Sequence, residues 1–132
     1  MKHVIVVEDD AHNGVLFRKI LEKRLNLSVT LTEDPAEVLE HVRADNVDLV
    51  IMDVSLRHSM WEGTPVGGVE ITRMVRAEAR RPIPIMLATA HAMRGDGERL
   101  LAESGADDYV SKPIVDHEAF AARVRELMER AA

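Results

Sequence analysis

The stretch that decides the fold is Val47-Asp48-Leu49-Val50-Ile51-Met52-Asp53-Val54-Ser55, an apolar run that ends in a carboxylate. Residues 49–52 show no polar alternation, which is typical of a strand covered on both faces in a parallel sheet. Asp53 then stands at the carboxyl end of the strand, the edge of an open α/β sheet where ligands bind. A single Asp in this place more often belongs to a turn or a helix cap, so its meaning depends on the other strands.

Short apolar runs alternate with amphipathic stretches along the whole chain. The apolar runs predict strands at 4–7, 28–31, 49–52, 85–88 and 108–110. The amphipathic stretches predict helices after Asp9 or Asp10, after Asp34, at 69–79, at 93–104 and around 120–128. This βαβαβαβαβα order predicts a flavodoxin-like, doubly wound (βα)5 fold. Its five-stranded parallel sheet is expected in the order 2-1-3-4-5, with helices on both faces.

Composition limits the classes of protein that the chain can represent. A length of 132 residues with 46% hydrophobic content suits one domain, residues 1–132, with no room for an output domain. The net charge of −6 and the pI near 5.5 argue against nonspecific binding to nucleic acid or to an anionic membrane. The first apolar run, Val4–Val7, is too short for a signal peptide or a membrane span, so we expect a cytoplasmic protein.

Polar side chains follow four of the five predicted strands. If the first strand lies beside the third, the ends of all four converge at the switch point of the sheet. The groups are Glu8, Asp9 and Asp10 after the first strand, Asp53 after the third, Thr89 after the fourth and Lys112 after the fifth.

This set of groups suits phosphoryl transfer with a divalent cation. Clustered carboxylates repel one another and need a cation to stay ionised together. A hard, oxygen-ligated Mg²⁺ fits better than zinc, because the chain has no cysteine and no histidine pair at ligand spacing. Lys112 and the Thr89 hydroxyl can neutralise and position phosphoryl oxygens, and Asp53 can act as the nucleophile that forms an aspartyl phosphate.

At these residues the sequence closely resembles the receiver domain of two-component response regulators, of the stand-alone, chemotaxis-regulator type. The resemblance covers essentially the whole chain. The matching motifs are Val6-Val7-Glu8-Asp9, Ile51-Met52-Asp53, Pro84-Ile85-Met86-Leu87-Ala88-Thr89-Ala90 and Tyr109-Val110-Ser111-Lys112-Pro113.

The resemblance implies a role for each acid at the strand ends. Asp53 would be the phosphoacceptor and also a ligand of Mg²⁺. Asp9 would bind the ion directly, Glu8 through a water molecule, and Ser55 through its backbone carbonyl.

The resemblance also implies the residues that hold and sense the phosphoryl group. Lys112 would contact the group and the acid pair, and Thr89 with the Ala90 amide would grip its oxygens. The Lys112-Pro113 bond would be the cis peptide of the family. As Thr89 moves toward the phosphoryl group, Tyr109 would fill the space behind it.

This switch would remodel a surface on the fourth helix, fifth strand and fifth helix, where partners of the family dock. In this sequence the surface would include parts of Met93 to Leu101, Tyr109, and Ala119 to Arg123.

The loop from Val54 to Gly68 departs from the family pattern, being about six residues longer than usual, and long loops tend to be functional or mobile. Arg57 replaces the usual proline, and the only tryptophan, Trp61, follows. The loop is either a lid or specificity contact at the site, or a surface excursion in which Trp61 folds back on the third helix. His91, two residues after Thr89, occupies a position that tunes phosphoryl lifetime in the family, as Ser55 does.

We therefore expect a phosphorylation-dependent switch, loaded by a sensor histidine kinase or a histidine phosphotransfer protein and binding a downstream protein target. The alternatives are a phosphorelay intermediate that passes the group to a histidine phosphotransfer protein, and a binding module that works without phosphorylation. An Asp-nucleophile phosphatase is disfavoured, because Ser55 stands where its second acid would be. The chain is thus not expected to be an enzyme beyond its own phosphorylation and dephosphorylation.

Overall fold

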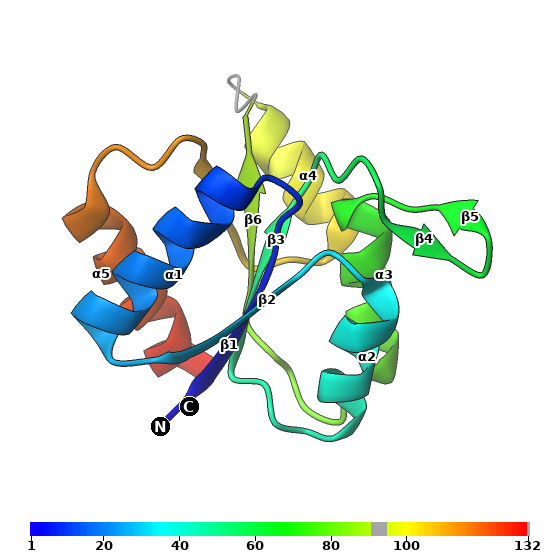
Figure 1. Cartoon of the computed structure of the whole chain (residues 1–132), viewed down its shortest axis with the longest axis horizontal. Coiled ribbons are helices and arrows are strands. Elements are labelled where there is room, and N and C mark those ends of the chain that lie inside the picture. The colour runs from blue at the N-terminus through cyan, green and yellow to red at the C-terminus, as the bar shows by residue number, and fades with distance from the viewer. Residues whose placement is uncertain (91–94, 132) are drawn as a thin grey trace.

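A five-stranded parallel sheet runs through the centre of this computed structural model, which describes residues 1–90 and 95–131 (Figure 1). Its strands follow the order β2-β1-β3-β6-β7, which confirms the predicted order 2-1-3-4-5, since β6 and β7 are the fourth and fifth strands of this sheet. The strands are β1 (His3–Val7), β2 (Ser28–Thr32), β3 (Leu49–Asp53), β6 (Ile85–Thr89) and β7 (Asp108–Ser111).

In the described part of the chain, five helices cover the two faces of the sheet, with α1 and α5 on one face and α2, α3 and α4 on the other (Figure 1). Alternate residues of β1 reach the two layers: Val4 and Val6 pack toward α1 and α5, whereas Ile5 and Val7 pack toward α2 and α3. Both faces are therefore apolar, which explains the uninterrupted apolar runs of the sequence. The helices are α1 (Ala11–Leu25), α2 (Pro35–Arg43), α3 (Gly68–Glu78), α4 (Asp96–Ser104) and α5 (His117–Ala131).

Carboxylates cap the first two helices. The Asp10 carboxylate accepts hydrogen bonds from the N–H groups of His12 and Asn13, and that of Asp34 accepts from Ala36. Both thus satisfy N–H groups that lack partners within the helix.

The fourth helix ends as predicted, at Ser104 before Gly105, whose φ of 81° suits the left-handed cap. Its predicted start at Met93 lies outside the described residues, as does His91. Within 1–90 and 95–131, no helix combines the length and apolarity needed to cross a membrane.

The segment predicted as one long loop, residues 54–68, contains a two-stranded antiparallel hairpin. Strands β4 (Met60–Trp61) and β5 (Thr64–Pro65) pair around Glu62 and Gly63, whose φ angles of 51° and 80° fit a tight two-residue turn. Strands of two residues are too short to show a periodic pattern, so they could not be predicted from the sequence. Strand β4 contacts α2, and half-buried Trp61 packs against the core on that face of the sheet.

Candidate functional site

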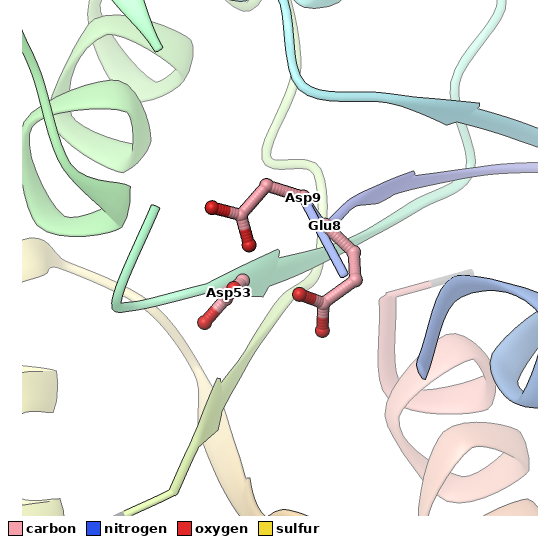
Figure 2. A group of neighbouring side chains, drawn as sticks. All are labelled: Glu8, Asp9 and Asp53. Carbon is pink, nitrogen blue, oxygen red and sulfur yellow. The ribbon is translucent and has the colours of Figure 1, made fainter. Parts of the chain in front are cut away.

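Three carboxylates meet at the carboxyl ends of β1 and β3. Glu8 and Asp9 follow β1, Asp53 ends β3, and one oxygen from each lies within 4.8 Å of the others (Figure 2). The two strands are direct neighbours, with Val7 opposite Met52, and this pairing brings the acids together. Glu8 is 7% exposed and Asp53 2% exposed, so two of the acids are nearly removed from water.

The ammonium group of Lys112 lies between the two buried acids. Its Nζ is 3.0 Å from Asp53 Oδ1 and 3.1 Å from Glu8 Oε1. The Lys112 backbone N–H donates to the Thr89 carbonyl at 2.8 Å, which fixes the end of β7 against the end of β6. The Lys112-Pro113 peptide is cis, as the resemblance implied.

The two buried acids have pKa values shifted in opposite directions. Burial, together with the hydrogen bond and charge of Asp53, raises the pKa of Glu8 to about 7. Burial also acts to raise the pKa of Asp53. Hydrogen bonds with Glu8, the Ser55 N–H and Lys112 outweigh it, so the pKa of Asp53 is lowered. Asp53 is consequently the carboxylate that stays ionised, as a nucleophile must.

The pKa of Lys112 is raised. Burial acts to lower it, but hydrogen bonds and charge attraction from Asp53 and Glu8 prevail. The ammonium therefore stays charged beside the acid pair at neutral pH.

The acids open into a cavity of about 470 Å³ at this edge of the sheet. The exposed residue Ala90, directly after β6, lines it, and the Ser55 N–H donates to Asp53 Oδ1 at 2.9 Å. Thr89, 4% exposed, is the last residue of β6. Among the described residues, those lining the cavity are Glu8, Asp9, Asp10, Asn13, Asp53, Ser55, Arg57, His58, Ala90, Lys112 and Pro113.

Tyr109, the predicted switch aromatic, lies on β7 beside α4. A Cβ atom placed on Gly97 of α4 would lie 2.0 Å from Cζ of the Tyr109 ring, so the ring occupies the space that a side chain at 97 would need. Tyr109 also packs against the core on the α2–α4 side of the sheet. Its position is thus defined by α4 as well as by its own strand.

Three of the lining residues, Asn13, Arg57 and His58, were not among the predicted site residues, although the lid alternative placed the segment of Arg57 and His58 at the site. The Arg57 backbone N–H donates to Asp9 Oδ2 at 2.8 Å, which joins the long 54–68 segment to the acid cluster. A main-chain contact leaves no residue pattern to find. The one available sign was the replacement of the family's proline, because proline has no N–H to donate.

Trp61 does not line the cavity, whereas Arg57 and His58 do. The segment therefore divides into a first part at the site and a hairpin that packs on α2. A lid formed by Trp61 is not what the described residues show. The tryptophan packs back on the core, as the surface-excursion alternative held, against a cluster to which both α2 and α3 contribute.

The donor set fits a hard divalent cation. Carboxylate and backbone carbonyl oxygens are the ligands that Mg²⁺ prefers, and three carboxylates with one ammonium leave negative charge to neutralise. Sequence comparison decides the family: the profile of the response regulator receiver domain matches residues 4–125. The chain belongs to the response regulator receiver domain family. Receiver domains accept a phosphoryl group on an aspartate in a Mg²⁺-dependent reaction and signal through histidine kinases and downstream targets.

Individual relatives agree with this membership. The receiver domain is 36% identical to the polar-differentiation response regulator DivK of Brucella ovis over 114 residues, which cover 86% of this chain and 85% of the relative. DivK of Brucella anthropi is 35% identical over the same coverage.

Solved structures show the same fold. A CheY-like receiver from Methanospirillum hungatei superposes with a TM-score of 0.79 at 20% identity, covering 99% of this chain and 96% of the other. The receiver of a Pseudomonas aeruginosa sensor histidine kinase gives 0.72 at 26% identity, covering 98% and 96%, and that structure holds a magnesium ion in its active-site cleft.

Proposed function

We propose that this receiver domain works as a single-domain response regulator in which Asp53 accepts a phosphoryl group from a histidine kinase. The observation that carries the proposal is the position of Lys112 Nζ, 3.0 Å from Asp53 Oδ1 and 3.1 Å from Glu8. An ionised, nearly buried Asp with an ammonium at hydrogen-bond distance suits attack on a phosphoryl group.

In this reaction an Asp53 oxygen attacks phosphorus and forms a new P–O bond. The P–N bond of the phosphohistidine donor breaks, and the imidazole leaves with the electron pair. Lys112 would neutralise charge on the transferred oxygens, while the Thr89 hydroxyl and the Ala90 N–H would hold them. Hydrolysis of the aspartyl phosphate would later restore the carboxylate, so the chain modifies itself and has no separate substrate to turn over.

Mg²⁺ would be held by Asp53 and Asp9 directly, by Glu8 through water and by the Ser55 carbonyl. The bound ion would supply positive charge for the phosphoryl oxygens. Asp53 stays ionised without the ion because Lys112 and the Ser55 N–H both contact its Oδ1.

Phosphorylation would act on the surface formed by α4, β7 and α5. A phosphoryl group adds about −2 charge, and Thr89 moving toward it would let Tyr109 fill the vacated space. The surface would include residues 96–101 of α4, Tyr109, and Ala119 to Arg123 of α5, while Met93 lies outside the described residues. A downstream protein is the proposed partner there, and transfer to a histidine phosphotransfer protein is the second candidate. The cytoplasmic location stays a prediction, to be tested by cell fractionation.

The test is intact mass after addition of acetyl phosphate with and without Mg²⁺. We expect one phosphoryl adduct in the wild type that requires Mg²⁺, and none in Asp53→Asn. Asp10→Asn is the matched control, since it removes one negative charge from the same cavity and asparagine caps a helix as well as aspartate does. An adduct in Asp53→Asn, or none in folded wild type with acetyl phosphate or a cognate kinase, would favour the binding module that works without phosphorylation.

A further inference from the structure

The start of the 54–68 segment brings two basic residues to the cavity. Arg57 and His58 are both exposed, and both line the cavity that contains Asp53 and Lys112. Within the described part of the chain, the Arg57 guanidinium forms no ion pair and no hydrogen bond, in contrast to Arg43, Arg76 and Arg81. It is therefore free to bind a ligand.

Backbone contacts hold Arg57 in place at the cavity. The Arg57 N–H is bonded to Asp9, and Ser59, two residues later, is 4% exposed with its Oγ donating to the Glu33 carbonyl at 2.6 Å. The Ser59 carbonyl in turn accepts from the Val66 N–H at 3.0 Å, on the far side of the hairpin. With contacts on both sides, the Cα of Arg57 has little freedom to move away from the site.

The charges of the cavity explain why a second cationic side chain, in addition to Lys112, would matter. Four acids line it, Glu8, Asp9, Asp10 and Asp53, and those that are ionised repel an incoming phosphoryl donor. The Lys112 ammonium is already bonded to the acid pair. An unpaired guanidinium can bind phosphoryl oxygens through two parallel hydrogen bonds, a geometry that lysine cannot provide.

We propose that Arg57 is a donor-binding residue, which holds the phosphoryl group of the incoming donor at the mouth of the cavity. The proposal rests on the proposed function of Asp53 as phosphoacceptor. Arg57 would contact the donor only through its side chain, while its backbone N–H keeps the contact to Asp9.

The experiment compares Arg57→Gln with wild type and with Arg80→Gln. Arg80 is also exposed and follows the C-terminal end of α3. It does not line the cavity, so Arg80→Gln controls for the loss of one positive charge. The rate of phosphorylation by acetyl phosphate with Mg²⁺ is followed by intact mass over a range of donor concentrations, at low and high salt. The dissociation constant for Mg²⁺ alone is measured by calorimetry.

For Arg57→Gln we expect the half-saturating concentration of acetyl phosphate to rise roughly threefold to tenfold, as for loss of a partly exposed charged contact to phosphate. The rate should also depend less on salt, since one steering charge is gone. The dissociation constant for Mg²⁺ should stay the same or fall, because a cation near the acids has been removed. Arg57→Lys should recover part of the donor affinity.

Two results would overturn the inference. One is an unchanged half-saturating concentration, equal in Arg57→Gln, Arg80→Gln and wild type at low salt. The other is weaker Mg²⁺ binding in Arg57→Gln, which would assign the residue to the metal site. If wild type itself gains no adduct, the proposed function fails first, and the inference falls with it.

Discussion

Gly97 of α4 has no side chain, and the Tyr109 ring, the proposed switch aromatic, occupies the space that a side chain there would need. A Cβ atom at position 97 would lie 2.0, 2.3 and 2.5 Å from three carbons of the ring. Carbon atoms pack at about 3.5–4.0 Å, so Gly97→Ala requires the ring or the helix to move by roughly 1.5 Å. The substitution is therefore an overpacking mutation at the proposed switch.

Two opposing effects set its magnitude. Alanine favours a helix over glycine by up to about 1 kcal/mol. Overpacking a filled site costs about 1–3 kcal/mol. We therefore expect Gly97→Ala to lower the free energy of unfolding by about 1 kcal/mol, with the packing cost exceeding the helix gain.

The chain supplies a matched control in Gly14 of α1. A Cβ atom there would meet only the two methyl ends of Leu31, at 3.4 and 3.5 Å. Gly14→Ala should thus show the helix gain almost alone and raise the free energy of unfolding by up to about 1 kcal/mol.

Urea unfolding of both variants, each with Tyr109 and with Tyr109→Ala, isolates the contact. In the Tyr109→Ala background Gly97→Ala should no longer destabilise, and the coupling between the two positions should reach about 1–3 kcal/mol. The amide shifts of β7 should also change in Gly97→Ala before any phosphodonor is added. If Gly97→Ala is as stabilising as Gly14→Ala while Tyr109 is present, the ring does not depend on the slot and the reasoning is wrong.

Three further predictions concern the buried contacts of the site. The Glu8 carboxyl keeps its proton up to about pH 7 in the folded chain but loses it near pH 4.5 in the unfolded chain. The free energy of unfolding without Mg²⁺ should therefore fall as the pH rises from 4.5 to about 7. Urea midpoints at pH 5 and 7.5 should show the slope in wild type and lose it in Glu8→Gln. Lys112→Met leaves Glu8 and Asp53 without their ammonium and should lower the free energy of unfolding by about 3 kcal/mol, as for a broken buried ion pair. In thermal unfolding, added Mg²⁺ should restore part of this stability. No recovery with Mg²⁺ would contradict a cation site there. Ser59→Ala leaves the Glu33 carbonyl without its donor and should lower the free energy of unfolding by about 1–2 kcal/mol. Amide hydrogen exchange in the β4–β5 hairpin should become faster. Unchanged exchange would mean that the Ser59 contact does not anchor the hairpin.

The fold was predictable because both faces of the sheet are covered. Residues 49–52 read as a buried strand only because α1 and α5 lie on one side and α2 to α4 on the other, and the same holds for 4–7 and 85–88. Acids at the ends of such runs then had to converge, since parallel strands end at one edge. The cluster of Glu8, Asp9 and Asp53 followed from topology.

The features that could not be predicted depend on backbone contacts and on the absence of a side chain at one glycine. The bond from the Arg57 N–H to Asp9 involves a group that every residue except proline possesses. The slot at Gly97 is defined by an absent side chain, which in the sequence looks the same as the permissive Gly14. The β4–β5 hairpin is held by the Ser59 hydroxyl and by packing on α2, neither of which follows a period.

The opposite pKa shifts of Glu8 and Asp53 indicate how the acid pair is balanced before any cation binds. Near neutral pH the acid pair without a divalent ion is balanced by one proton, held mainly on Glu8, and by the Lys112 ammonium. A divalent cation held by these acids would supply more positive charge than the proton on Glu8, and would offset the charge of Asp9 as well. Asp53 is already ionised before the cation arrives, because Lys112 and the Ser55 N–H stabilise its negative form. The acid proposed as the nucleophile is thus ionised by the fold, and a bound cation would be available to neutralise the phosphoryl group.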